Sequence, residues 1–134
     1  MKGIEITPDK WPGFCQSFSH LHRGWLVSIS AFEPTDEGFG LIPDEAHAHR
    51  TSCDLPFAGL TLEPNQRDLM MRLGEGKLHI SEPIRAVTRI RMLETEEGAH
   101  AGLRIDRSDH TGIMLMFRVA ARSDELDGVA ASER

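Results

Sequence analysis

The first candidates for chemistry in this sequence are histidines spaced two residues apart and followed by a cysteine. His47 and His49 precede Cys53 in a stretch rich in acidic residues, glycine and proline. Alternate residues of an extended segment point to the same side, and imidazole and thiolate are ligands that Zn²⁺ prefers. A metal site would therefore use His47, His49 and Cys53. Because no CxxC or HExxH motif accompanies them, the alternative of exposed polar side chains is favoured.

A second group of candidate residues surrounds a glycine in the stretch FSHLHRGWLVSI at residues 18–29. His22, Arg23 and Trp25 bring an imidazole, a guanidinium and an indole close together, and such a group could bind an anionic ligand. Gly24 is typical of a helix end, so the same residues could instead form a corner, with Trp25 in the core. No GxSxG or glycine-rich phosphate loop occurs, so no catalytic residue is assigned.

Arginines recur at positions predicted to face solvent. They are Arg72, Arg89, Arg91, Arg104 and Arg118. Neighbouring strands could gather Arg89, Arg91 and Arg104 into a patch that binds a phosphate or carboxylate group. The alternative, which is favoured, is that they pair with acids on adjacent strands. The acids at suitable positions are Glu63, Glu94 and Asp106.

The elements that must position these residues begin with one helix. Thr7 is a candidate N-cap with Pro8 in the first turn, although the regular helix could start only near Pro12. Apolar residues then recur at helical spacing, at Trp11, Phe14, Cys15, Phe18 and Leu21. This stripe predicts a helix that lies on a hydrophobic core and ends near Gly24.

After the helix the apolar residues alternate, which predicts β-strands. The first has Trp25, Val27 and Ile29 on its inner face. Further strands are predicted around residues 57–63, 69–73, 78–80, 87–94, 101–105 and 113–119. A long acidic surface loop is predicted at about 33–55, and a flexible tail at 123–134.

These elements predict a mainly β (α+β) fold in one domain over residues 1–122. An N-terminal helix would cap a small antiparallel β-barrel or curled sheet of about six or seven strands. Unprotected strand edges and three methionines expected on the outer face, Met70, Met114 and Met116, predict a two-fold homodimer that buries the face or edge carrying Met114 and Met116.

Composition excludes several classes of protein. The 134 residues are 40% hydrophobic and 27% charged, which is typical of a globular domain rather than a disordered chain. The net charge of −6 makes nucleic-acid binding unfavourable. No apolar run reaches the roughly 18–20 residues of a membrane helix, and the start MKGIEITPDKW is unlike a signal peptide. We therefore expect a cytoplasmic protein with no membrane association, two free thiols and no cofactor.

Three fragments resemble a bacterial family of small proteins that form a domain of unknown function. They are WPGFCQSFSHLHRGWLV at 11–27, DLPFAGL at 54–60 and HISEP at 79–83, of which HRGWLV is the most distinctive. The resemblance implies no activity, only that His22, Arg23, Gly24 and Trp25 belong to a shared corner. The sequence departs from the family pattern at Pro12 and in its longer acidic loop at 33–52.

The function predicted from the sequence is a non-catalytic binding or protein-interaction module that self-associates. Its partner would be a protein or a small anionic ligand. The alternative is a small enzyme or metal-binding protein that uses His22 and Arg23, or His47 and His49.

Overall fold

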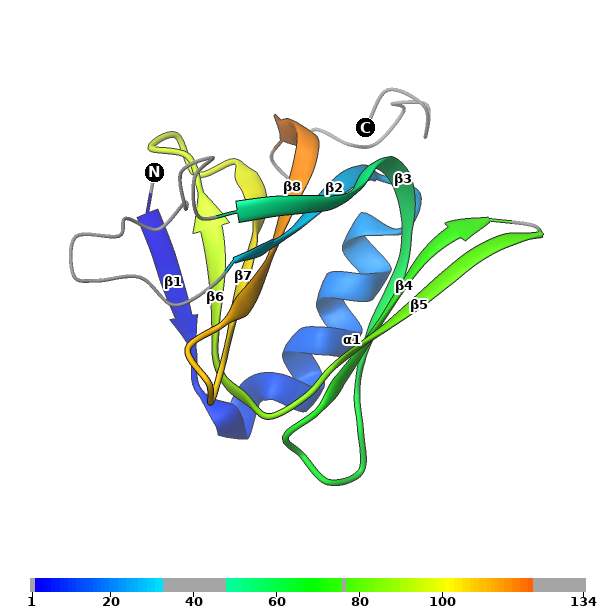
Figure 1. The fold of residues 1–134 in the computed structure, drawn as a ribbon. Coiled ribbons are helices and arrows are strands. Elements are labelled where there is room, and N and C mark those ends of the chain that lie inside the picture. Colours follow the sequence, from blue (N-terminus) through cyan, green and yellow to red (C-terminus); the bar gives the residue numbers. More distant parts are fainter. Residues whose placement is uncertain (1, 33–47, 76, 122–134) are drawn as a thin grey trace.

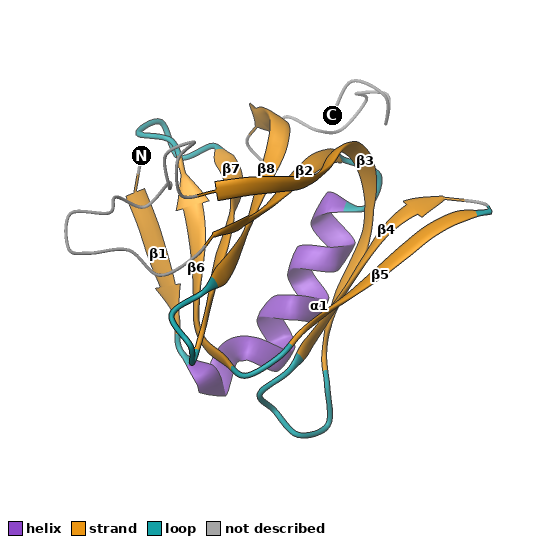
Figure 2. Cartoon of the chain, in the orientation of Figure 1, coloured by secondary structure: helices purple, strands orange, loops and turns teal. Residues whose placement is uncertain are grey.

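The computed structural model describes residues 2–32, 48–75 and 77–121, with side chains except at 48–53, 75, 78 and 119–121 (Figure 1). In this part of the chain, eight strands form one antiparallel sheet, and a single α-helix follows the first strand (Figure 2). The predicted mainly β fold with an N-terminal helix is therefore confirmed. The tail at 123–134 and most of the acidic loop lie outside the described residues.

The sheet has the strand order β1-β6-β7-β8-β2-β3-β4-β5. The strands are β1 (Lys2–Ile6), β2 (Leu26–Phe32), β3 (Ala48–Leu62), β4 (Leu69–Glu75), β5 (Leu78–Ile84), β6 (Val87–Glu94), β7 (His100–Arg107) and β8 (Gly112–Ala121). The sheet is open, with β1 and β5 at its two ends, so the curled-sheet alternative is correct and the barrel is wrong.

Two prolines, Pro8 and Pro12, lie in the first turns of the helical segment. A short 3-10 turn, η1 (Pro8–Lys10), leads into α1 (Trp11–His22). Pro12 lies in the first turn of α1, where its missing N–H removes no helical hydrogen bond. The indole N–H of Trp11 donates to the carbonyl of Ile6 at 2.9 Å, which ties the start of α1 to the end of β1. No helix in the described residues is long and apolar enough to span a membrane.

One face of α1 is buried against the sheet. The buried side chains are Trp11, Cys15, Phe18 and His22, which follow one another at helical spacing. Leu21, predicted at the end of this stripe, is exposed, and His22 takes its place. The helix ends as predicted, because Gly24 adopts a φ of 88°.

The sheet curves around α1, and the helix packs into the larger of the two apolar clusters formed by the described residues (Figure 1). The fifteen-residue strand β3 produces this curvature, because its first part pairs with β2 and its second part pairs with β4. Trp11, Cys15 and Phe18 of α1 share this core with the concave-face residues of the strands. Examples from the strands are Val27, Leu60, Leu69, Ile90, Leu103 and Leu115.

Two strands differ from the sequence prediction. β1 was not predicted, since five residues give too short an alternation to read. β3 begins at Ala48, so the loop prediction is wrong for residues 48–55. Its pairing with β2 contains register shifts near Ile29, and Asp54 has a φ of 50°. Backbone hydrogen bonds therefore hold a segment whose register with β2 is irregular.

A smaller apolar cluster lies on the convex face of the sheet. It contains Leu93, Ala101 and Met114, with Met116 packed against it. Met114 is only 3% exposed, so the prediction that it is exposed on an outer face is wrong. Gly102 makes this packing possible, because a Cβ there would overlap the carbonyl oxygen of Leu115 and lie 2.9 Å from the sulfur of Met116.

Substitution of Gly102 tests this packing. We expect Gly102→Ala to lower the free energy of unfolding by about 1–3 kcal/mol, because the backbone of β8 must move away. Gly13→Ala is the matched control: a Cβ at Gly13 meets nothing within 4 Å, and alanine favours the helix by up to about 1 kcal/mol. Denaturant titration measures both, and equal stabilities of Gly102→Ala and the parent would contradict the packing.

Candidate functional site

The corner between α1 and β2 encloses His22 completely. His22 is 0% exposed, and its ring stacks on Phe117 with ring centroids 4.8 Å apart. Phe18 lies 4.3 Å away by the same measure, and Trp25 packs edge-on at 4.4 Å. The predicted corner is therefore present, and it is built around an imidazole among aromatic rings.

The hydrogen bonds of His22 fix the positions of its protons. Nδ1 of His22 lies 2.8 Å from the carbonyl oxygen of Phe18, which can only accept, so Nδ1 carries the proton. In the neutral ring, Nε2 is then an acceptor. It lies 2.9 Å from Nδ1 of His100, which must donate to it. A directed chain runs from His100 through His22 to the backbone of α1.

Burial explains why His22 stays neutral. Desolvation lowers its pKa from 6.5 to about 4; the hydrogen bond to Phe18 opposes this shift, and the nearby His100 adds to it. The indole Nε1 of Trp25, also in this corner, is buried and has no hydrogen-bond partner among the described residues. A proton added to His22 would therefore place a charge in surroundings that offer it little solvation.

His100 is the residue of this hydrogen-bond chain that the sequence analysis did not identify. It is the first residue of β7 and lies half-buried where the pairing of β7 with β8 is irregular. It is 78 residues from His22 in the sequence, so no local motif connects the two. Its Nδ1 proton is engaged by His22.

The arginines of the predicted patch each contact an acidic residue. Nε of Arg89 lies 2.6 Å from Glu5 on β1. Arg91 and Arg104 contact the two oxygens of Asp106, at 2.8 and 2.9 Å. Asp106 was among the acids predicted to pair with them, whereas Glu5 could not be foreseen without β1.

Arg104 has a further contact that limits its movement. Its guanidinium lies over the ring of Phe32, 4.6 Å from the centroid. The side chains of Arg104 and Asp106 are largely buried, whereas those of Arg89 and Glu5 are about half exposed. The geometry therefore brings the predicted arginines together on β6 and β7, but against carboxylates.

The metal hypothesis concerns residues that the structure describes only in part. His47 lies outside the described residues, and only the backbones of His49 and Cys53 are described, in β3. Among the described residues, no group of three or more metal-ligating side chains could hold an ion.

A groove lies between α1 and the second half of β3, with a volume of about 560 Å³. We call it the α1 groove. Its lining residues are Pro12, Cys15, Gln16, Ser19, His20, Arg23, Leu60, Thr61, Leu62, Glu63, Pro64 and Gln66. Of the residues predicted to bind a ligand, Arg23 lines this groove. Cys15 and Leu60 are buried and form an apolar floor, while the charged and amide side chains form a polar rim.

Hydrogen bonds to the backbone of β3 fix the two walls of the α1 groove against each other. The hydroxyl of Ser19 donates to the carbonyl of Leu60 at 2.9 Å and accepts from its N–H at 2.8 Å. The N–H of Gly24 donates to the carbonyl of Phe57 at 2.8 Å. β3 therefore runs back along α1, which places Arg23 and Glu63 towards opposite ends of the groove.

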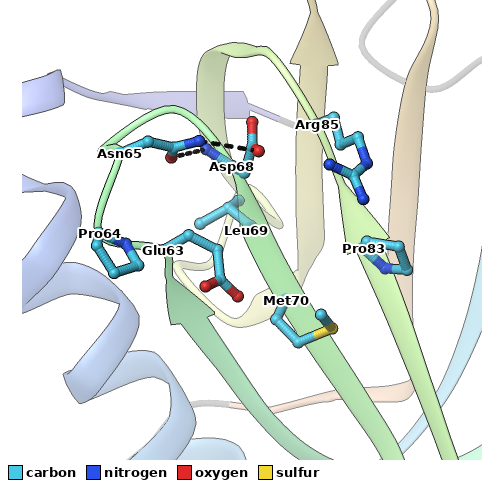
Figure 3. A pocket seen from close by; sticks show the side chains of 8 residues that line it. All are labelled: Glu63, Pro64, Asn65, Asp68, Leu69, Met70, Pro83 and Arg85. Carbon is cyan, nitrogen blue, oxygen red and sulfur yellow. Dashed lines mark hydrogen bonds between the residues drawn. The ribbon is translucent and has the colours of Figure 1, made fainter.

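The turn at 63–68, which ends the groove, is held by hydrogen bonds. Oδ1 of Asn65 accepts from the N–H groups of Arg67 and Asp68 at 2.9 and 3.0 Å. The N–H of Ala86 donates to Asp68 at 2.9 Å, and this bond, together with one from Asn65, lowers the pKa of Asp68. A second hollow of about 360 Å³ lies beside this turn, with Glu63 and Arg85 on opposite sides of it (Figure 3).

Comparison of the chain with protein-family models, curated proteins and solved structures gave no match. The resemblance to a bacterial family at 11–27, 54–60 and 79–83 stays a prediction.

The burial of neutral His22 predicts how stability depends on pH. Between pH 6.5 and about 4 the unfolded chain binds a proton at His22 that the folded chain does not. Neutral His22 should therefore contribute fully to the free energy of unfolding above pH 6.5. This contribution, about 3 kcal/mol, should be lost as the pH drops from 6.5 to about 4.

Denaturant titrations at several pH values measure this dependence. His22→Gln should lose that part of the pH dependence, although it also lowers stability at pH 7. His20→Gln, which removes an exposed imidazole of the same helix, is the matched control. An unchanged slope in His22→Gln would contradict the assignment.

Proposed function

We propose that the protein is a non-catalytic binding module that self-associates and holds a short segment of a protein partner in the α1 groove. The observation that carries this proposal is the groove itself, with an apolar floor and a polar rim. Its volume of about 560 Å³ lies within the range of ligand sites, roughly 300–1,000 Å³.

The charges of the groove favour a segment with an acidic group. Among the described residues, Arg23 makes no ion pair, whereas Arg89, Arg91 and Arg104 each face a carboxylate. An acidic side chain or a terminal carboxylate of the partner would therefore find a free guanidinium at Arg23. Glu63 towards the other end favours a basic group in the partner, which gives the bound segment a direction.

The length of α1 sets the size of the bound segment. Its twelve residues span about 18 Å at 1.5 Å per residue. An extended peptide of about five or six residues covers the same distance. The groove walls are already joined by Ser19 and Leu60, so binding needs little rearrangement of the protein.

Two further features support binding rather than catalysis. Both ring nitrogens of His22 are engaged and the ring is fully buried, so it is unsuited to contact a substrate. Cys15 is a free, buried thiol whose pKa is raised to about 11 by burial, so it is a poor nucleophile. A free thiol is also typical of a reducing compartment, which supports a cytoplasmic location.

Peptide selection tests the proposed binding function. Random peptides of about six residues displayed on phage are selected against the immobilised full chain. We expect enriched peptides to carry an acidic residue and to lose about tenfold or more in affinity with Arg23→Glu, because one charged contact is reversed.

Arg118→Glu is the matched control, since Arg118 is also exposed but lies on β8. Binding is measured by fluorescence polarisation of the enriched peptides. Selection of no peptide, or of peptides that bind Arg23→Glu as tightly as the parent, would overturn the proposal.

A further inference from the structure

We propose that two copies of the chain associate through β5, pairing these strands antiparallel about a two-fold axis at Ile80. The partner is a second copy of this chain, and the association would join two open sheets into one. This inference rests on the self-association in the proposed function, but it does not depend on what the α1 groove binds.

β5 is an open and regular edge. It pairs with β4 on one side, and no strand of the described residues pairs with its other side. Its register with β4 runs without a bulge from Ile84 opposite Leu69 to Leu78 opposite Glu75. In Figure 1 the β4–β5 hairpin extends away from the rest of the sheet, so its outer edge is accessible.

Little in β5 protects this edge from pairing. Residues 79–83 are all exposed, and Lys77 precedes the strand rather than lying within it. Bulges, central lysines and prolines are the usual means of blocking a sheet edge. The proline of β5, Pro83, lies next to the end of the strand, where it leaves the middle free to donate and accept hydrogen bonds.

A row of apolar side chains crosses the sheet and ends at β5 with an exposed residue. Phe57 on β3 lies opposite Leu73 on β4, and Leu73 lies opposite Ile80. Phe57 and Leu73 are buried, whereas Ile80 is 45% exposed. Directly opposite residues share one face of a sheet, so Ile80 continues the core row to the edge. A second copy of Ile80 placed opposite would complete this row.

Symmetry restricts the possible registers. In an antiparallel pair related by a two-fold axis, the axis is normal to the sheet, and a residue can oppose only itself or residues an even number of positions away. An axis at Glu82 places two carboxylates opposite each other, which is repulsive. An axis at Ser81 places Ile80 opposite Glu82 twice.

An axis at Ile80 removes the Glu82–Glu82 and Ile80–Glu82 pairs. It pairs residues 78–82 and leaves only Leu78, at the end of the strand, opposite Glu82. It places the two Ile80 side chains together and His79 opposite Ser81. The Glu82 carboxylates are then separated by four residues along the paired strands, about 13 Å. This register therefore joins apolar to apolar at the axis and keeps the like charges apart.

The other open edge fits a second copy less well. β1 has five residues against seven in β5, and it contains Gly3, which weakens a strand. Its exposed isoleucine, Ile4, is 41% exposed and lies opposite Met92. Ile4 is therefore a matched control for Ile80: the same residue type, similarly exposed, on the opposite edge.

Light scattering over a series of micromolar concentrations tests the inference, because a single strand pair is a small interface and should dissociate in that range. The parent should approach twice the 15.0 kDa mass of the chain. Ile80→Lys should be monomeric, because it places two ammonium groups at the axis, whereas Ile4→Lys should remain dimeric. Circular dichroism checks that both variants fold.

Cysteine cross-linking tests the register. Directly opposed residues of paired strands have Cα atoms about 4.5–5.5 Å apart, which suits a disulfide. Ile80→Cys should therefore form a covalent dimer on mild oxidation, and Glu82→Cys should not. Cross-linking of Glu82→Cys alone would overturn the Ile80-centred register.

The remaining outcomes separate this inference from the proposed function. A dimer that persists in Ile80→Lys, or dissociates only in Ile4→Lys, overturns the β5 interface while self-association stands. A parent that is monomeric at every concentration overturns self-association and this inference together. Peptide binding in the α1 groove is measured independently, and loss of that binding alone leaves the β5 interface supported.

Discussion

A neutral imidazole buried at the end of α1 is the constraint on which the rest of the structure depends. His22 donates to the helix backbone and accepts from His100, so it joins α1 to the start of β7. Both bonds require a neutral ring with its proton on Nδ1. The aromatic rings of Phe18, Trp25 and Phe117 surround it and exclude water, which in turn keeps the ring neutral.

The position of α1 follows from contacts at three points along its length. The indole of Trp11 holds its start to β1, Ser19 holds its middle to β3, and His22 holds its end to β7. The sheet curves around the helix, and β3 supplies the bend by pairing with β2 and then with β4. The same bend creates the α1 groove and directs the β4–β5 hairpin outward, so both proposed interaction surfaces are consequences of how α1 is held.

The spacing of apolar residues along the sequence predicted the elements that depend on short stretches of chain. The buried stripe from Trp11 to Phe18 and the inner face of β2 follow from helical and alternating spacing, and Gly24 ends the helix because its φ is positive. The first part of β3 could not be predicted in this way, because backbone pairing with β2 holds a segment whose register is irregular. Leu21 and His22 follow Phe18 by three and four residues, and helical spacing allows either to be buried; the apolar Leu21 was chosen, whereas the structure buries His22. Its partner His100 is set by tertiary structure alone.

The protonation of His22, neutral with its proton on Nδ1 and accepting a hydrogen bond from His100, can be measured directly. Long-range ¹H–¹⁵N NMR spectra of the imidazole rings distinguish the two tautomers and follow protonation with pH. We expect an Nδ1–H tautomer for His22 that persists down to pH values near 4, because burial lowers the pKa of the ring. An Nε2–H tautomer, or a His22 ring that becomes protonated near pH 6.5, would contradict it.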